Sequence, residues 1–144
     1  MVKKINFDMD GTIADLYGVT NWLEYLQSEN AYPYGQAKPL VNLQALARRL
    51  NNLKKKGYEV NIVSWLAKNG TSQYNQEVTK TKIKWLRKHL KSVTFDNIYI
   101  VPYGTPKHTI SEGILFDDEE QNIKAWGKGG YYPEDIFKVL STLN

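Results

Sequence analysis

The sequence predicts a three-layer α/β/α fold with a central parallel sheet. Short apolar runs alternate along the chain with longer stretches whose apolar residues recur every three or four positions. The first run, residues 2–7, is mostly apolar and β-prone, as in a strand buried on both faces. The length of 144 residues, with 42% hydrophobic and 24% charged residues, fits one domain with a single core. Strands that alternate with helices form parallel sheets with right-handed crossovers.

The first half of the chain contains the most regular helical pattern. Leucines recur at helical spacing between Pro39, which suits a first turn, and Gly57, which suits a left-handed stop. The prolines and the glycine of residues 29–39 predict a loop, and we expect a small cap-like insertion at about 17–39. The expected elements are a strand at 2–7, a short helix at 21–28, a loop at 29–39, a helix at 40–56 and a strand at 58–63.

The second half continues the alternation. A long helix is expected at 75–90, with Val78, Ile83, Leu86 and Leu90 facing inward and its lysines facing outward. Pro102 ends the following strand, and Pro133 opens the last helix. The remaining expected elements are strands at 97–101 and 114–116, a short helix at 119–126, a small edge strand at 131–132 and a helix at 133–143.

Composition limits the kind of site and partner. The chain has no cysteine, which excludes disulfides, thiolate metal ligands and a cysteine nucleophile. Its apolar runs are far shorter than the ~20 residues of a membrane span, so we expect no membrane partner and a cytoplasmic location. The net charge is +4, and most of the lysines are interpreted as solvated helix faces.

Acidic residues gather at the ends of two predicted strands. Asp8 and Asp10 follow the first strand, and Asp117 and Asp118 follow the strand at 114–116. Ligands of open α/β sheets bind at the carboxyl ends of the strands, so these side chains are expected to meet. Two carboxylates ~4 Å apart repel by roughly 4 kcal/mol at an effective dielectric near 20, which favours a cation between them. Oxygen ligands of this kind suit Mg²⁺ and leave positions for a phosphate.

Two further residues fit a phosphate site. Lys107 lies in a loop ten residues before Asp117, where its ammonium can hold Asp8 ionised and neutralise phosphate oxygens. Ser64 adds a hydroxyl after the strand at 58–63. Lys82 and Lys68 compete with Lys107 for this role, and Lys107 is favoured because of its loop. The plainer alternatives are a structural Asp turn at residues 8–12, a strand-end hydroxyl at Ser64 and a turn cap at Asp15.

These residues resemble the motifs of the haloacid dehalogenase-like hydrolases of the phosphatase type. The stretch DMDGT at residues 8–12 is similar to the first motif, Ser64 to the second, Lys107 to the third and Asp117-Asp118 to the fourth, in the required order. The stretch DMDGTIADLYG is also similar to the opening of the 5'(3')-deoxyribonucleotidases. The resemblance implies a Rossmann-like fold with a minimal cap, because only about twenty residues separate Tyr17 from Pro39.

The resemblance also implies a role for each site residue. Asp8 would attack phosphorus to form an aspartyl-phosphate, and Asp10 would act as general acid and then as general base. Mg²⁺ would be held by Asp8, Asp117 and the main-chain carbonyl of Asp10, with Asp118 acting directly or through water. The phosphate-binding candidates are Thr12, Ser64, Trp65 and Lys107. The substrate-binding candidates are Asp15, Tyr17, Lys68 and Asn69, and the aromatic residues Tyr17, Trp22, Trp65 and Tyr103 are candidates for stacking on a base or for the core or rim.

The predicted function is therefore a Mg²⁺-dependent phosphomonoesterase acting on a nucleotide or another small phosphate ester. One alternative is a phosphatase of polynucleotide ends or phosphoproteins, for which nucleic acid is a less favoured partner. Another is a non-catalytic Mg²⁺ or phosphate-binding module. The sequence leaves the oligomeric state open.

Overall fold

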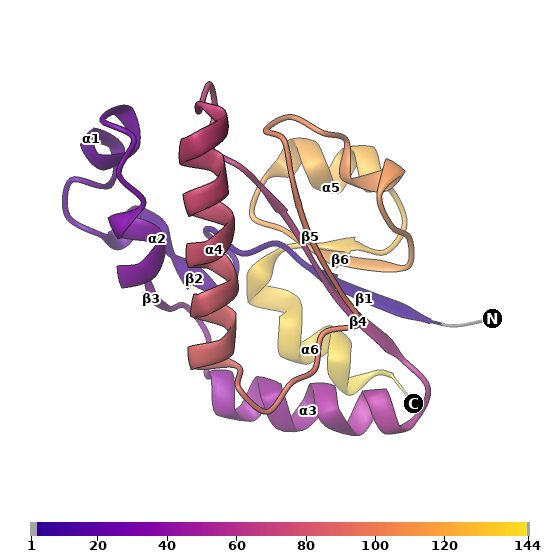
Figure 1. The fold of residues 1–144 in the computed structure, drawn as a ribbon. Helices are drawn as coiled ribbons and strands as arrows, with labels where there is room; N and C mark the ends of the chain where they lie inside the picture. Colours follow the sequence, from indigo (N-terminus) through magenta and orange to yellow (C-terminus); the bar gives the residue numbers. More distant parts are fainter. Residues whose placement is uncertain (1–2, 144) are drawn as a thin grey trace.

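The computed structural model describes residues 3–143 and contains a five-stranded parallel sheet in the order β5-β4-β1-β6-β7 (Figure 1). The strands are β1 (Lys4–Phe7), β4 (Glu59–Trp65), β5 (Asn97–Val101), β6 (Ile114–Phe116) and β7 (Gly130–Tyr131). Because β1 is central and all strands are parallel, their carboxyl ends meet at one edge. The predicted α/β fold is confirmed, and Val2 of the first predicted strand lies outside the described residues.

Helices cover both faces of the sheet. The side chains of Ile5 and Phe7 on β1 share one apolar core with α3 (Leu43–Lys55), α4 (Ser72–His89) and α6 (Ile136–Ser141). The helix α5 (Glu120–Trp126) connects β6 to β7 and lies across the strands from α3 (Figure 1). A right-handed crossover requires this side for α5, because β6 and β7 extend the sheet away from β4.

The second face of the sheet contains a row of polar side chains. The amide of Asn61 donates to the side-chain oxygen of Asn6 over 3.0 Å, and the amide of Asn97 donates to that of Asn61 over 3.1 Å. Asn6 also donates to the carbonyl oxygens of Glu112 and Ile114. Because these amides are hydrogen-bonded, their burial costs little free energy. The row therefore helps to fix the register of β1, β4 and β5.

Residues 14–39 form a small lobe beside α4 (Figure 1). It contains the two-residue strands β2 (Ala14–Asp15) and β3 (Lys38–Pro39), the short 3₁₀ helix η1 (Leu16–Gly18), and the helices α1 (Trp22–Gln27) and α2 (Tyr32–Gln36). The predicted loop at 29–39 is wrong, because Pro33 occupies the first turn of α2, where a missing N–H costs nothing. Tyr34 packs with Tyr74 and Val78 of α4 in a second apolar cluster.

Three helix starts also differ from prediction. Pro39 belongs to β3, and α3 begins after Asn42, whose side chain accepts from Ala45 N–H. The helix α4 begins after Thr71, which caps it in the same way. Pro133 opens the 3₁₀ turn η3 (Pro133–Asp135), and α6 follows. Among the described helices, none is long and apolar enough to cross a membrane.

Candidate active site

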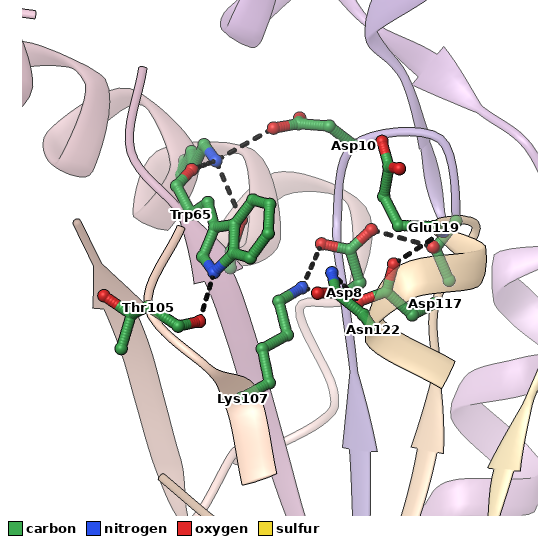
Figure 2. Close-up of polar contacts among 11 residues, drawn as sticks. Asp8, Asp10, Trp65, Thr105, Lys107, Asp117, Glu119 and Asn122 are labelled. Atoms are coloured by element: carbon green, nitrogen blue, oxygen red, sulfur yellow. Dashed lines mark hydrogen bonds and ion pairs between the residues drawn. The ribbon is translucent and has the colours of Figure 1, made fainter. Parts of the chain in front are cut away.

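The acidic residues of the first and fourth predicted strands meet at the carboxyl edge of the sheet. Asp8 follows β1 and Asp117 follows β6, and these two strands are hydrogen-bonded neighbours. The Lys107 side chain reaches both carboxylates from the short 3₁₀ helix η2 (Lys107–Thr109), which follows β5 (Figure 2). The expectation that these distant positions meet at one place agrees with this geometry.

Both oxygens of Asp8 have partners. Lys107 Nζ lies 2.8 Å from Asp8 Oδ1, and the Thr12 hydroxyl donates to Asp8 Oδ2 over 2.9 Å. Gly11 makes this return of the chain possible, because its φ of 81° lies in the left-handed region. The Asp8 carboxylate, which lines a cavity, is therefore held in one orientation.

Asp117 is fully buried, and both of its carboxylate oxygens accept hydrogen bonds. Its Oδ2 accepts from Lys107 Nζ over 2.7 Å and from Asn122 Nδ2 over 3.1 Å, while Oδ1 accepts from Glu119 N–H. Burial works against the Lys107 ammonium, but Asp8 and Asp117 outweigh it and raise the pKa of Lys107. One lysine therefore serves two carboxylates.

Asp118 completes a cluster of three acids. Oxygens of Asp8, Asp117 and Asp118 lie within 4.8 Å of one another. Burial and the neighbouring charge of Asp8 raise the pKa of both Asp117 and Asp118. The cluster is short of positive charge, and its hard oxygen donors are those that Mg²⁺ prefers. The residues present thus fit a divalent cation.

Asp10 faces a different partner. Its Oδ2 lies 2.9 Å from Nζ of Lys82, which also donates to Ser64 Oγ over 2.8 Å and to the Trp65 carbonyl over 2.6 Å. Burial raises the pKa of Asp10 above its ordinary value, although Lys82 opposes the shift. A carboxyl group with a raised pKa retains its proton more readily near neutral pH, as a general acid must.

A cavity of about 260 Å³ opens above these carboxylates. Its lining includes four acids, Asp8, Asp10, Asp117 and Asp118, and several aromatic side chains. Tyr17 and Trp22 come from the 14–39 lobe, with ring centroids 4.9 Å apart, and Trp65 and Tyr103 pack at the same separation. The indole of Trp65 also lies over Lys107 Nζ. The cavity is therefore lined both by charged side chains and by flat aromatic rings.

The structure divides the other candidate residues. Lys107, Trp65, Tyr17 and Lys68 line the cavity, whereas Thr12, Ser64, Asp15 and Asn69 lie outside its lining. Thr12 and Ser64 are fully buried and bind Asp8 and Lys82, respectively. Asp15 accepts from Gly18 N–H, which is the turn-capping role given above as its alternative.

The prediction that the lysines of α4 face outward is wrong for Lys82, which is 1% exposed. Lys82 follows Val78 by four positions and Tyr74 by eight, so it lies on the buried face of α4. This spacing in the sequence indicates that Lys82 is buried. Asn122 and Tyr34 were also missed, because a lone amide and a loop-like tyrosine carry no comparable pattern.

The chain resembles a solved phosphatase in structure. It aligns with the crystal structure of D,D-heptose 1,7-bisphosphate phosphatase from Burkholderia thailandensis at a TM-score of 0.60, with 97% of each chain covered and 11% sequence identity. The two proteins share a fold. The predicted α/β Rossmann-like fold is thereby confirmed, while the resemblance to the haloacid dehalogenase-like hydrolases, and to the deoxyribonucleotidases among them, stays a prediction. No protein-family model matches the chain, and the comparison with curated proteins gives no match.

Proposed function

We propose that this protein is a Mg²⁺-dependent phosphomonoesterase that acts through an aspartyl-phosphate. The observation that carries the proposal is the bridge formed by Lys107 between Asp8 and Asp117, in the lining of a cavity that Asp10 also lines. A purely structural ion pair would not need two further acids, Asp10 and Asp118, at the same opening.

The proposed reaction consists of two successive displacements. An oxygen of Asp8 attacks phosphorus, and the bond to the leaving oxygen breaks as that oxygen takes a proton from Asp10. Asp10 then removes a proton from water, which attacks the phosphorus and releases inorganic phosphate and Asp8. The Lys107 ammonium balances charge on Asp8 and on the phosphoryl oxygens.

Mg²⁺ would be held by Asp8, Asp117, Asp118 and the main-chain carbonyl of Asp10. When bound, it supplies positive charge to the transferring phosphoryl group. The same acids without a cation repel one another, which is consistent with the raised pKa values of Asp117 and Asp118.

The cavity favours a small substrate with a flat group. At about 260 Å³ it falls just below the roughly 300–1,000 Å³ usual for small-molecule sites, and Tyr17 and Tyr103 extend the surface at its mouth. A nucleoside monophosphate would place its phosphate at Asp8 and its base against these rings. The basic residue Lys68, which lies over the Tyr103 ring, would face a second anionic group of the substrate.

The test is a screen of nucleoside monophosphates, sugar phosphates and aryl phosphates with Mg²⁺, run on the native protein and on Asp8→Asn. Asp8→Asn should abolish turnover and leave the melting temperature within a few degrees of the native value. Asp135→Asn is the matched control, because Asp135 precedes α6 and lies outside the cavity lining, and it should keep full activity. Native turnover by Asp8→Asn would disprove the nucleophile assignment. Steep salt dependence on oligonucleotides, but not on mononucleotides, would favour the polynucleotide alternative.

A further inference from the structure

Lys82 is a buried ammonium whose donors all go to the edge of the proposed active site. It lies in the middle of α4, 1% exposed, and its three acceptors are Asp10 Oδ2, Ser64 Oγ and the Trp65 carbonyl, at 2.9, 2.8 and 2.6 Å. A buried charge is costly unless it is paired and hydrogen-bonded. The ammonium of Lys82 has three donors, and its three acceptors match them in number.

The fold alone does not require a charge at this position. The rest of the buried face of α4 consists of Tyr74, Val78, Trp85 and Leu86, and a methionine or leucine would continue that apolar face. Lys82 Nζ also lies 5.1 Å from the centroid of the Tyr34 ring, so the 14–39 lobe packs over it. The charge is therefore placed where α4, that lobe and the ends of β1 and β4 come together.

Lys82 contacts Asp10 from outside the cavity lining. Asp10 lines the cavity, whereas Lys82 does not. Of the two Asp10 oxygens, Oδ2 binds Lys82, and Oδ1 forms no hydrogen bond with any of residues 3–143. Without Lys82, nothing in the hydrogen-bond pattern would determine which oxygen faces the substrate.

We propose that Lys82 is a positioning residue that fixes Asp10 by its Oδ2, so that Oδ1 meets the leaving-group oxygen. The inference rests on the function proposed above. In the first displacement, the proton on Oδ1 passes to the leaving oxygen as that oxygen receives the electron pair of the P–O bond. Lys82 keeps its own protons throughout, and its bonds to Ser64 and Trp65 tie the end of β4 to the same point.

The first test compares leaving groups in Lys82→Met, which keeps the length of the side chain and removes the charge. An alkyl phosphate needs its leaving oxygen protonated, whereas nitrophenolate leaves without help. A misplaced general acid should therefore lower kcat/KM by about 100-fold or more for an alkyl phosphate, and by less than about tenfold for p-nitrophenyl phosphate. Lys84→Met, at an exposed position of the same helix, is the control and should change neither value. Equal losses on both substrates would overturn the proposal.

The absence of cysteine allows the ammonium to be restored chemically. Lys82→Cys can be alkylated with 2-bromoethylamine in the unfolded state, which rebuilds a lysine-like amine at this position alone, and then refolded. We expect the alkyl phosphate activity to return, while alkylation with iodoacetamide, which adds a neutral group, should leave it low. Equal activity of the two adducts would contradict a role for the charge.

A crystal structure of Lys82→Met gives a readout that does not depend on turnover. The Asp10 carboxylate should leave its present position or occupy several, while Asp8 and Asp117 stay in place. An unmoved Asp10 would disprove the positioning role even if the native protein were active. If Lys82→Met does not fold, Lys82→Leu, which also removes the donor and continues the apolar face of α4, takes its place in both measurements. A native protein that hydrolyses no phosphate ester would instead disprove the proposed function, and the crystal structure would still decide on Lys82.

Discussion

Lys107 Nζ lies 2.8 Å from Asp8 Oδ1, although 99 positions of the chain separate the two residues. The same ammonium lies 2.7 Å from Asp117 Oδ2, and the side chains of Lys107 and Asp117 are almost completely buried. Removal of one member of such a cluster leaves uncompensated charge inside the protein, whereas loss of an exposed ion pair costs little.

Lys107→Met should therefore affect both stability and the site. We expect a loss of about 3 kcal/mol in the free energy of unfolding at pH 7, measured by urea denaturation without metal. Lys124→Met is the control, because Lys124 pairs with Glu120 on the exposed surface and should change stability by less than about 0.5 kcal/mol. An equal loss of unfolding free energy in the two variants would show that the buried bridge contributes no more to stability than an exposed ion pair.

Mg²⁺ should stabilise the folded protein through the three clustered acids. A ligand that binds only the folded state adds about 2.7 kcal/mol at 100 times its dissociation constant. We expect the melting temperature to rise with Mg²⁺ and to fall with a chelator, and Asp118→Asn should reduce the rise. An identical melting temperature with Mg²⁺ and with chelator would contradict a metal site here.

The metal-free protein should become more stable as the pH falls from 8 to 5. Burial and the charge of Asp8 raise the pKa of Asp117 to about 6 and that of Asp118 to about 8. A folded pKa above the unfolded value means that the folded state binds the proton more tightly, so this stability is lost as the pH rises through the folded pKa. Melting curves in chelator between pH 5 and pH 8 measure the effect, which should be smaller in Asp118→Asn, where Asp117 still contributes.

Much of this architecture follows from local sequence, and the misses have non-local causes. The strand at 97–101 and the strand at 114–116 were predicted with their observed bounds, because apolar runs are closed by Pro102 and by Asp117. The helix at 32–36 was missed, since it depends on Tyr34 packing against α4, a contact that no local pattern contains. Pro39 suits a helix start by its local pattern, but β3 pairs it with Ala14.

The candidate site divides in the same way. The acids that follow β1 and β6 were predictable, because parallel strands bring their ends to one edge. Lys82 was predicted to be solvated, as most helical lysines are, and its burial depends on Asp10, 72 positions away. Thr12 was expected at the phosphate, but its hydroxyl binds Asp8, four residues before it.

Asp96 should make stability depend on pH in the opposite sense to Asp118. Burial alone would raise the pKa of Asp96, but hydrogen bonds from Lys54 and from Val60 N–H outweigh burial and lower it. Stability from a lowered carboxyl pKa is present above the unfolded value and is lost as the pH falls through the folded one. Asp96→Asn should cost about 1 kcal/mol at pH 7, a modest amount because the side chain is partly solvated, and the difference should disappear near pH 2. Urea unfolding at both pH values is the measurement, and a constant difference would contradict this account.

Tyr103 should contribute to the recognition of flat substrates. It is 51% exposed at the cavity mouth beside Trp65, and Tyr32, which is equally exposed outside the cavity lining, is a matched control. Stacking of a base on an aromatic ring contributes about 1–3 kcal/mol, so Tyr103→Ala should raise KM for a nucleoside monophosphate at least fivefold. KM for glycerol phosphate should stay the same, and Tyr32→Ala should change neither. An equal rise for both substrates would indicate that the ring shapes the cavity and does not stack.

Glu29 should hold the 14–39 lobe against the start of α4. Its carboxylate accepts from Thr71 N–H over 2.9 Å and from the Thr71 hydroxyl over 2.8 Å, and Tyr74 OH donates to the neighbouring Asn30 carbonyl. An acidic side chain at a helix N-terminus contributes about 0.3–1 kcal/mol, and the lobe carries Tyr17 and Trp22 of the cavity wall. Glu29→Ala should therefore increase amide hydrogen exchange in α1 and α2 several-fold and raise KM more than it lowers kcat. Glu24→Ala, at an exposed position of the same lobe, should leave both unchanged. If exchange in α1 and α2 stayed at the native rate in Glu29→Ala, the lobe would be held by its apolar contacts with Val78 and Tyr74 alone.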